Sequence, residues 1–419
     1  MLQLCISAIA SNQGKTILTT ALLYHFRTSV RPYKIGPDFI DPQFHKQVCG
    51  TDSVNLDSFI MSEEQVAWLY HHYANKKVAI LEGVMGFYDG ENKGCSAYSI
   101  SKLLNIPTIL VLDGSGSYIT ISAVLKGLLA YKTDNTIQAV VLNNLSSAMH
   151  YALIQQQIQA DHPHITVLGW IQKKLPALSD THLGLDLKDL NKIEQISQEV
   201  LQHIDLTQLH TLISPTPTPT LPNHYPFPTI KQRKEKLAIV HDQNFSFCYY
   251  DNLCFLKELF QEVVIIDATH DQSIPSDCDR VYLCGGYVET PKAYAKIKNA
   301  TTFKNSLIKH AQTKPIYAEC AGLLYLGKGV DEKKMSGILD ITFTLGKRFT
   351  RLGYYYNESG IKGHAFHYTH PTPASLEKGF DVLSKTPQGR GEVGSWSQGR
   401  VFGTYLHTMF RTYPQLLEG

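Results

Sequence analysis

Residues 7–16 have the composition of a loop that binds phosphate. Their sequence, S-A-I-A-S-N-Q-G-K-T, follows an apolar run and precedes a helical pattern. A loop between a strand and a helix directs backbone N–H groups at one point, which suits a phosphate group. Lys15 would neutralise phosphate oxygens, and Thr16 would offer its hydroxyl to Mg²⁺. Ile9 stands where the usual G-x-x-x-x-G-K-T motif has its first glycine, so the loop departs from that motif.

Two acidic motifs supply carboxylates that would suit the same chemistry. They are K-I-G-P-D-F-I-D-P, with Asp38 and Asp41, and E-G-V-M-G-F-Y-D-G, with Glu82 and Asp89. Carboxylates near phosphates act as Mg²⁺ ligands or position a carboxylate substrate. The plainer interpretation is that these Asp residues cap turns, because Pro-Asp and Asp-Gly are turn sequences. The phosphate loop in the same chain favours the site.

A cysteine at the end of an expected strand has the pattern of a nucleophile. Cys320 follows Ile316–Tyr317 and precedes two small residues and an apolar helix pattern, as in a nucleophile elbow. A thiolate there would attack a carbonyl carbon, and His407, after the strand-like 401–406, would protonate the departing group. The loop Cys284–Tyr287 would supply an oxyanion hole through backbone N–H groups. A buried core cysteine is the alternative, and the Gly-Gly loop and the downstream histidine weigh against it.

Strands must end beside these side chains if the side chains are to act together. Short apolar runs bounded by Gly, Asn or Asp are typical of buried parallel strands, and helix-period segments lie between them. The runs are Leu2–Ile9, Val78–Leu81, Ile109–Leu112 and Ala139–Leu142 in the first half, and Leu237–Val240, Val263–Ile266, Arg280–Leu283 and Ile316–Tyr317 in the second. The alternation predicts an α/β fold with two doubly wound domains.

A proline-rich stretch separates the two halves. Ser214–Pro228 has proline at nearly every second or third position, which excludes a helix and a central strand. A chain of 419 residues is also too long for one ordinary core. We predict a nucleotide-binding domain over residues 1–206, a linker over 207–235 and a second catalytic domain over 236–419.

Composition excludes several classes of protein. The 39 Lys and Arg residues nearly balance 37 Asp and Glu residues, without the dense basic face that nucleic-acid binding requires. No apolar run reaches the roughly 18–20 residues of a membrane span, and the amino terminus lacks a signal peptide. The eight cysteines are scattered without a C-x-x-C pair, which argues against a disulfide framework or a zinc site. We expect a soluble, cytoplasmic protein that binds neither nucleic acid nor membranes.

The phosphate loop and the two acidic motifs together resemble the family of cobyrinic acid a,c-diamide synthases, which are glutamine amidotransferases of the corrinoid pathway. The ATP-binding half of that family is similar to dethiobiotin synthetase and shares the departure at Ile9. The resemblance implies a P-loop NTPase-like amidoligase domain, in which ATP phosphorylates a carboxylate of a tetrapyrrole and ammonia displaces the phosphate. It implies ATP and Mg²⁺ as cofactors.

The resemblance also implies roles for individual residues of the first half. The nucleotide-binding positions are Gly14, Lys15, Thr16 and Asn143, with Asn144 as the alternative on the base side. The acidic positions at the metal and the reacting carboxylate are Asp38, Asp41, Glu82 and Asp89, and the metal ligands among all these are Thr16, Asp38 and Glu82. Thr181–Leu185 resembles the H-L-G-L segment of the family.

The second half resembles a class I glutamine amidotransferase domain of the cobyric-acid-synthase type, with Cys320 and His407 as the catalytic pair. Residues 245–253 and 363–369 are similar to motifs of the diamide synthases. Met409 stands where triad amidotransferases carry Glu; the resembled subfamily also lacks that Glu, so another group must orient His407. Ala365 replaces the usual Glu of G-H-E-F-H-Y.

The implied reaction is the amidation of the a and c acetates of cobyrinic acid with glutamine and ATP, in cobalamin biosynthesis. The same chemistry on nickel-sirohydrochlorin or hydrogenobyrinic acid stays open. So does a different class, a nucleotide-dependent binding protein with an inert second half, against which Cys320 and His407 argue. The sequence leaves the oligomeric state open, a homo-oligomer included.

Overall fold

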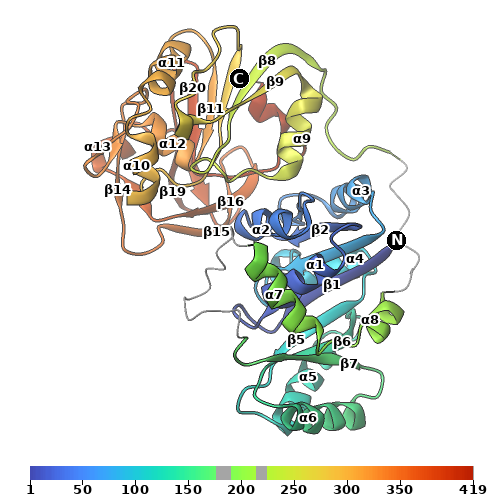
Figure 1. Cartoon of the computed structure of the whole chain (residues 1–419). Helices are drawn as coiled ribbons and strands as arrows, with labels where there is room; N and C mark the ends of the chain where they lie inside the picture. Colours follow the sequence, from blue (N-terminus) through green and yellow to red (C-terminus); the bar gives the residue numbers. More distant parts are fainter. Residues whose placement is uncertain (176–189, 214–223, 419) are drawn as a thin grey trace. The chain divides into compact units, whose positions relative to one another are not determined.

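The computed structural model describes residues 1–175, 190–213 and 224–418. They form two compact units, Met1–Pro226 and Phe227–Gly419 (Figure 1). Both units are α/β, as predicted. No helix in the described ranges is long and apolar enough to cross a membrane.

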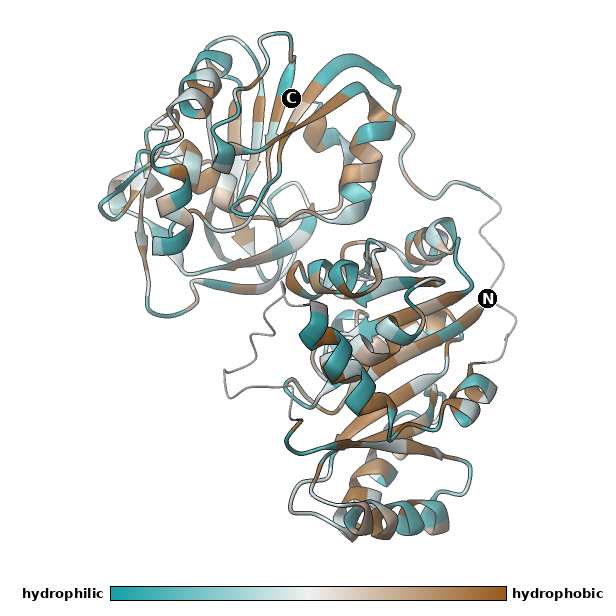
Figure 2. Ribbon diagram, in the orientation of Figure 1, coloured by the Kyte–Doolittle hydropathy of each residue, from teal (hydrophilic) through white to brown (hydrophobic). Residues whose placement is uncertain are grey.

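The first unit is built on a seven-stranded sheet in which all strands are parallel, in the order β3-β2-β4-β1-β5-β6-β7. The strands are β1 (Leu2–Ala8), β2 (Val30–Ile35), β3 (Val54–Leu56), β4 (Val78–Gly83), β5 (Thr108–Asp113), β6 (Ile137–Leu145) and β7 (Thr166–Gln172). Most of their residues are buried, and the strands are largely brown in Figure 2. Burial on both faces is typical of a parallel sheet covered by helices.

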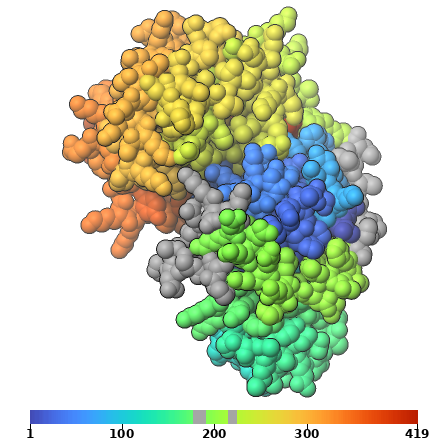
Figure 3. All heavy atoms as spheres, viewed as in Figure 1, coloured from blue at the N-terminus to red at the C-terminus, as the bar shows by residue number. Residues whose placement is uncertain are grey.

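Helices connect these strands in sequence, and two more follow the last strand. They are α1 (Lys15–His25), α2 (Ile40–Cys49), α3 (Glu63–Tyr73), the short η1 (Glu91–Lys93), α4 (Ala97–Leu103), α5 (Ile119–Tyr131), α6 (Ala148–Asp161), α7 (Leu190–Leu201) and α8 (Leu206–Leu212). α7 packs against α1, and Figure 3 shows its green residues against the blue amino-terminal ones. Because β1 lies at the centre of the sheet, between β4 and β5, the loops after β1, β2 and β4 meet at one edge.

The second unit is built on a mixed nine-stranded sheet in the order β16-β15-β18-β19-β20-β11-β10-β8-β9. The strands are β8 (Arg233–Val240), β9 (Phe260–Ile266), β10 (Arg280–Leu283), β11 (Ile316–Glu319), β15 (Arg351–Tyr356), β16 (Lys362–His367), β18 (Asp381–Ser384), β19 (Gly391–Gln398) and β20 (Val401–Thr404). The five from β9 to β20 are parallel, and the other four extend the sheet in antiparallel fashion.

The remaining elements of the second unit surround this sheet. They are the helices α9 (Tyr250–Leu259), α10 (Pro291–Ile297), α11 (Thr301–Ala311), α12 (Ala321–Leu326) and α13 (Pro373–Leu376), the short η2 (Ala268–His270) and η3 (Pro414–Leu417), and a small sheet of β12 (Gly329–Val330), β13 (Lys333–Lys334), β14 (Thr342–Leu345) and β17 (Thr369–Pro371). A hydrophobic core formed by these elements belongs to this unit, and a second core belongs to the first unit.

The structure differs from the linker boundaries that the sequence suggested, 207–235. Residues 206–212 form α8, and Leu209 and Ile213 are buried in the core of the first unit. Two apolar residues four apart occupy one face of a helix, so the chain packs there before the prolines begin. At the other end, β8 begins at Arg233. The proline-rich residues 214–223 and the H-L-G-L segment at 181–185 lie outside the described residues.

Candidate active sites

The phosphate loop of the first unit is closed by a glycine in a left-handed conformation. Gly14 has φ 92° immediately before α1, and a Cβ there would lie 2.4 Å from Nδ2 of Asn143. That amide donates a hydrogen bond to Gln13 O at 2.9 Å. Only glycine satisfies both constraints. The expected pair, Gly14 and Asn143, is therefore in contact across the carboxyl ends of β1 and β6.

Lys15 connects the phosphate loop with the loop after β4. Its Nζ donates hydrogen bonds to Ala10 O at 2.9 Å and to Met85 O at 2.5 Å. Burial and the nearby Lys34 charge lower the pKa of Lys15 to about 8. The ammonium therefore lies between the two loops that the sequence assigned to phosphate and to acidic groups.

A buried lysine holds the acidic residues together. Lys34 Nζ lies 2.5 Å from Asp41 Oδ2 and 3.6 Å from oxygens of both Asp38 and Glu82. Thr16 Oγ1 donates a hydrogen bond to Glu82 Oε1 at 2.9 Å. The structure thus brings four predicted site residues, Thr16, Asp38, Asp41 and Glu82, around one cation.

The protonation of this cluster follows from burial and from charge. Burial raises the pKa of Glu82, but the Lys34 charge and the hydrogen bonds from His45 and Thr16 outweigh it and lower the pKa to about 2. Burial and the Glu82 charge raise the pKa of Asp41 to about 6, in spite of Lys34. The three carboxylates together raise the pKa of Lys34 although burial lowers it. Glu82 and Lys34 are therefore charged at neutral pH.

His45 is a member of this cluster that the sequence analysis did not include. Its Nε2 lies 2.7 Å from Glu82 Oε2, its Nδ1 lies 3.1 Å from Ser53 Oγ, and the ring is buried. The spacing in the sequence could have identified His45. It follows Asp41 by four residues on α2, and residues four apart on a helix share a face. Lys34 was also left out, although it belongs to the acidic motif.

Asp38 and Asp89 have different surroundings from the other two acidic residues. Asp38 Oδ1 accepts hydrogen bonds from the N–H groups of Ile40 and Asp41 at 2.8 and 3.2 Å, so one oxygen caps the start of α2 while the other faces Lys34. Asp89 Oδ2 accepts the N–H of Gly86 at 2.8 Å. In the described contacts Asp89 is bound to its own loop, not to the Lys34 cluster, although its charge acts on Lys15.

A cavity of about 230 Å³ opens beside the phosphate loop. Its lining residues come from the loop and from the ends of β6 and β7: Asn12, Gly14, Lys15, Thr16, Ile17, Asn143, Asn144, Ile171, Gln172, Lys173 and Leu175. Both candidate base-side residues, Asn143 and Asn144, are in this wall. Asn144 Nδ2 donates to Asp113 Oδ2 at 3.0 Å. The cavity suits a nucleotide whose phosphates meet the loop.

The expected Mg²⁺ set fits in part. Among the described residues, no group of three or more His, Cys, Asp and Glu side chains forms a ready metal cage. Mg²⁺ usually keeps several waters and takes only one or two protein ligands plus phosphate oxygens. The adjacent Thr16 hydroxyl and Glu82 carboxylate match that requirement, whereas Asp38 is shared between Lys34 and the α2 cap.

In the second unit, Cys320 lies on a strained turn between β11 and α12. Its backbone angles are φ 47° and ψ −103°, rare for a residue with a side chain. A Cβ at Gly322 would lie 2.7 Å from Leu283 Cβ, so the helix packs closely on β10. This is the geometry predicted for a nucleophile elbow.

The His407 ring lies between the side chains of Cys320 and Glu319. Its Nδ1 is 2.9 Å from Glu319 Oε2, and the ring is hydrogen-bonded to Cys320. Burial lowers the pKa of His407, but the two hydrogen bonds outweigh it and raise the pKa to about 10. Glu319 is therefore the group that orients His407, a role that the sequence left without a candidate.

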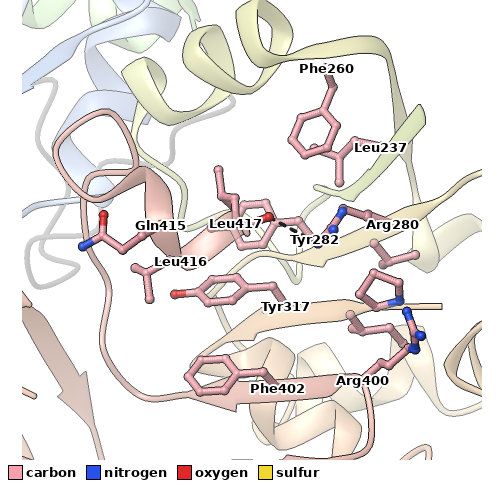
Figure 4. Close-up of a pocket in the computed structure, with 13 residues that line it drawn as sticks. Leu237, Phe260, Arg280, Tyr282, Tyr317, Arg400, Phe402, Gln415, Leu416 and Leu417 are labelled. Carbon is pink, nitrogen blue, oxygen red and sulfur yellow. Dashed lines mark hydrogen bonds between the residues drawn. The ribbon is translucent and has the colours of Figure 1, made fainter. Parts of the chain in front are cut away.

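Two tyrosines hold Glu319 in turn. Tyr282 OH donates to Glu319 Oε2 at 3.1 Å, and Tyr317 OH approaches Glu319 Oε1 at 3.5 Å. Figure 4 shows both rings beside Phe402 on three neighbouring strands, where they line a cavity of about 260 Å³. Other lining residues, such as Arg280 and Ile316, begin their strands, so this cavity lies toward the strand ends opposite Cys320.

The loop Cys284–Tyr287 leaves one N–H group for an oxyanion. The N–H groups of Cys284, Gly285 and Tyr287 donate to backbone carbonyls at 3.3, 3.2 and 2.8 Å. Within the described residues, Gly286 is the one member of this loop whose N–H group has no backbone carbonyl as acceptor. The loop also contacts the His407 ring directly, because a Cβ on Gly285 would lie 2.3 Å from His407 Cε1.

His367, a histidine near the carboxyl end of β16, is held by a backbone carbonyl and by an aromatic ring. His367 Nδ1 donates to Thr369 O at 2.8 Å, and the ring stacks on Tyr405; burial and Arg351 lower the pKa of His367 to about 3. Ala365 is fully buried on β16.

Residues 236–414 match the family described as the CobB/CobQ-like glutamine amidotransferase domain. Over the whole chain, the sequence is 32% identical to the cobyrinate a,c-diamide synthase of Streptococcus sanguinis, covering 100% of this chain and 98% of that protein. It is 31% identical to the enzyme of the same name from Caldanaerobacter subterraneus (98% and 95%) and 30% identical to that of Salmonella typhimurium (99% and 96%). Among solved structures, chloroplast FtsY from Physcomitrella patens has 16% identity and a TM-score of 0.32, covering 46% of this chain and 65% of its own; we draw nothing from that likeness.

Proposed function

We propose that this chain, which belongs to the cobyrinate a,c-diamide synthase family, amidates the a and c acetate groups of cobyrinic acid with ammonia from glutamine and with energy from ATP. The family makes it a ligase that uses glutamine as its nitrogen donor. The observation that carries the proposal is the Glu319–His407–Cys320 array, in a chain that also holds the Lys34 cluster beside a phosphate loop.

Glutamine would be hydrolysed in the second unit. The Cys320 thiolate attacks the side-chain amide of glutamine, and the Gly286 N–H faces the oxygen that becomes negative. His407, held by Glu319 through Nδ1, gives its proton to the departing ammonia. Water then releases glutamate from the thioester and restores the thiolate.

The carboxylate would be activated in the first unit. An acetate oxygen attacks the γ-phosphorus of ATP, ADP leaves, and ammonia then displaces phosphate from the acyl phosphate to form the amide. Lys15 and Lys34 stabilise the charge on the transferred phosphoryl group. Thr16 and Glu82 would hold Mg²⁺, which neutralises phosphate charge when bound. Asp41 and Asp89 would position the reacting carboxylate and ammonia.

Two other macrocycles are alternative substrates for the same reaction. Nickel-sirohydrochlorin and hydrogenobyrinic acid present the same acetates on related macrocycles. The roles proposed above act on the phosphates and on the amidated carboxylates, which these macrocycles share, so those roles do not discriminate among the substrates. We place the enzyme in the cytoplasm, which suits its eight free cysteines.

Mass spectrometry tests the proposal directly. Cobyrinic acid incubated with the protein, Mg-ATP and glutamine should lose about one mass unit per amide formed, in two ATP-dependent steps. The Cys320→Ala variant should lose the glutamine-dependent product and regain it with added ammonia. Glutamine hydrolysis without a mass change would exclude cobyrinic acid and direct the assay to the other two macrocycles. Absence of both activities would contradict the proposal.

A further inference from the structure

The segment that carries His407 lies outside regular secondary structure. β20 ends at Thr404, and residues 405–411 form no helix or strand apart from one isolated bridge between His407 and His364. Backbone N–H and C=O groups without a helix or a sheet need other partners when they are buried. The groups that supply these partners therefore set the position of the His407 imidazole.

On one side the segment is held by β16. His364 and His407 exchange two backbone hydrogen bonds, each 2.8 Å long, and Thr408 Oγ1 donates to Lys362 O at 2.6 Å. These contacts fix the backbone of His407 itself. They leave the residues after it to be held from elsewhere.

On another side the segment is held by one amide of α9. Asn252 is 1% exposed. Its Nδ2 donates to Thr408 O at 2.9 Å, and its Oδ1 accepts the N–H of Phe410 at 2.8 Å. One side chain thus satisfies a carbonyl and an N–H of the segment, as a neighbouring strand would.

The residue beside Asn252 holds the same segment through a charge. Arg411 Nε and Nη2 both donate to the Asp251 carboxylate, at 2.9–3.1 Å. Arg411 Nη1 donates to Glu258 Oε2 at 2.8 Å, also on α9. Arg411 is 1% exposed, so this ion pair is protected from solvent screening.

We propose that Asn252, supported by Asp251 and Arg411, is a positioning residue for His407. The space around the imidazole explains why position matters: Glu319 binds one nitrogen, Cys320 binds the ring, and Gly285 leaves no room for even a Cβ. Displacement of a catalytic group by about 1 Å can cost 10²-fold in rate. The inference rests on the proposed glutaminase, and it gives the motif at residues 245–253 a function.

The test compares Asn252→Ala with Ser306→Ala. Ser306 is a matched control on α11, because its Oγ accepts the Ile274 N–H at 2.9 Å and donates to Phe303 O at 2.8 Å. Each change removes a pair of hydrogen bonds between a side chain and the backbone. The readouts are kcat and KM for glutamine hydrolysis, ammonia-dependent amidation, and the rate of Cys320 alkylation by iodoacetamide between pH 6 and 10, followed by peptide mass spectrometry.

We expect Asn252→Ala to lower kcat for glutamine about 10²-fold, with a much smaller change in KM. The profile of Cys320 alkylation should differ from that of wild type, because the displaced imidazole no longer hydrogen-bonds the thiol. Ammonia-dependent amidation should stay within twofold of wild type, and Ser306→Ala should match wild type in every readout. A wild-type kcat and alkylation profile in Asn252→Ala would overturn the inference, as would equal losses in Ser306→Ala.

Two further variants keep the test decisive. If Asn252→Ala does not fold, Asn252→Asp takes its place under the same criteria, since it keeps the acceptor for Phe410 and sets an anionic oxygen against Thr408 O. If wild type does not hydrolyse glutamine, the proposed function fails by itself. The alkylation profile still judges the inference, because Asn252→Ala should then shift toward the profile of His407→Asn.

Discussion

Glu319 takes the place that a carboxylate two residues after His407 would occupy in a catalytic triad. It is the last residue of β11 and directly precedes Cys320, so the proposed nucleophile and the group that orients His407 are consecutive in the chain. Adjacent strand residues point to opposite faces, and the sharp turn at Cys320 is what lets both side chains reach the imidazole. The strained backbone therefore serves the geometry of both residues.

Glu319→Gln should weaken the pH dependence that His407 gives to stability, although Cys320 still binds the ring. A pKa raised from 6.5 to about 10 means that the folded protein binds the proton more tightly, so the stabilisation is full below pH 6.5 and is lost as the pH rises through 10. Urea unfolding from pH 6 to 10 should show this decline in wild type and a flatter profile in the variant. Equal slopes of the unfolding free energy against pH in wild type and variant would disprove this prediction. Glutamine hydrolysis should fall by roughly 10²–10⁴-fold.

Lys34→Met should leave three carboxylates around an uncharged side chain. Removing one partner from a buried ion pair costs about 3–5 kcal/mol, so the variant should be much less stable at pH 8. Lowering the pH to 5 should recover part of this loss, since Asp41, whose pKa is already raised, becomes neutral. Denaturant midpoints at the two pH values measure the effect. A loss that did not depend on pH would point to packing instead of charge.

At the scale of elements, the loop after β10 is shaped by the imidazole that it faces. Gly285→Ala would place a Cβ 2.3 Å from His407 Cε1, so the ring must move away from Cys320 or Glu319. We expect glutamine-dependent amidation to fall at least tenfold while ammonia-dependent amidation persists. The comparison of the two nitrogen sources in one assay separates this effect from general unfolding. Retention of glutamine-dependent turnover would show that the loop moves and the His407 ring stays in place.

Gly127→Ala provides a contrasting glycine on α5. Gly127 is exposed in the middle of the helix, and a Cβ there would contact nothing within 4 Å. Alanine should therefore stabilise the protein by about 0.5–1 kcal/mol through helix propensity and backbone entropy alone. Thermal unfolding measures the gain, and activity should be unchanged. A loss of stability would mean that the added methyl group clashes with another part of the protein.

At the scale of the whole molecule, the two proposed chemical steps belong to units with separate cores. The phosphate loop and the Lys34 cluster are built entirely from Met1–Pro226, and the Cys320 site is built entirely from Phe227–Gly419. Each site is therefore completed by the folding of its own unit. Variants in one site should leave the local chemistry of the other measurable, as the assays above assume.

Calorimetry should accordingly resolve two unfolding transitions. A ligand that binds only the native form of one unit stabilises that unit, by about 2.7 kcal/mol at a concentration 100 times its Kd. Mg-ATP should therefore raise the midpoint temperature of one transition and leave that of the other unchanged. The Lys15→Met substitution should abolish this increase. A single transition that moves as a whole with Mg-ATP would show that the two units unfold cooperatively.

The sequence by itself determined the fold class and predicted most of the residues that lie together at the two candidate sites. Apolar runs bounded by turn residues identified eight of the strands, because burial on both faces of a parallel sheet requires continuous apolar sequence. Strand β2 escaped this pattern, since Arg31 and Lys34 are buried within it and are satisfied by polar partners elsewhere in the fold. Local motifs found Lys15, Thr16 and Cys320, whose chemistry depends on neighbours in the chain.

Only the tertiary structure decided which partners those residues have. His45, Lys34 and Glu319 were missed as site residues because their neighbours in the sequence do not show which side chains they contact after folding. His45 and Lys34 contact Glu82 on β4, and Glu319 binds His407, 88 positions away. Asp89 illustrates the converse, since its motif suggested the acidic cluster and its described contact is with Gly86. Asn252 reaches the His407 segment across 156 positions of chain. Sequence patterns record local geometry, whereas the orientation of a catalytic group is set by contacts that exist only after the chain has folded.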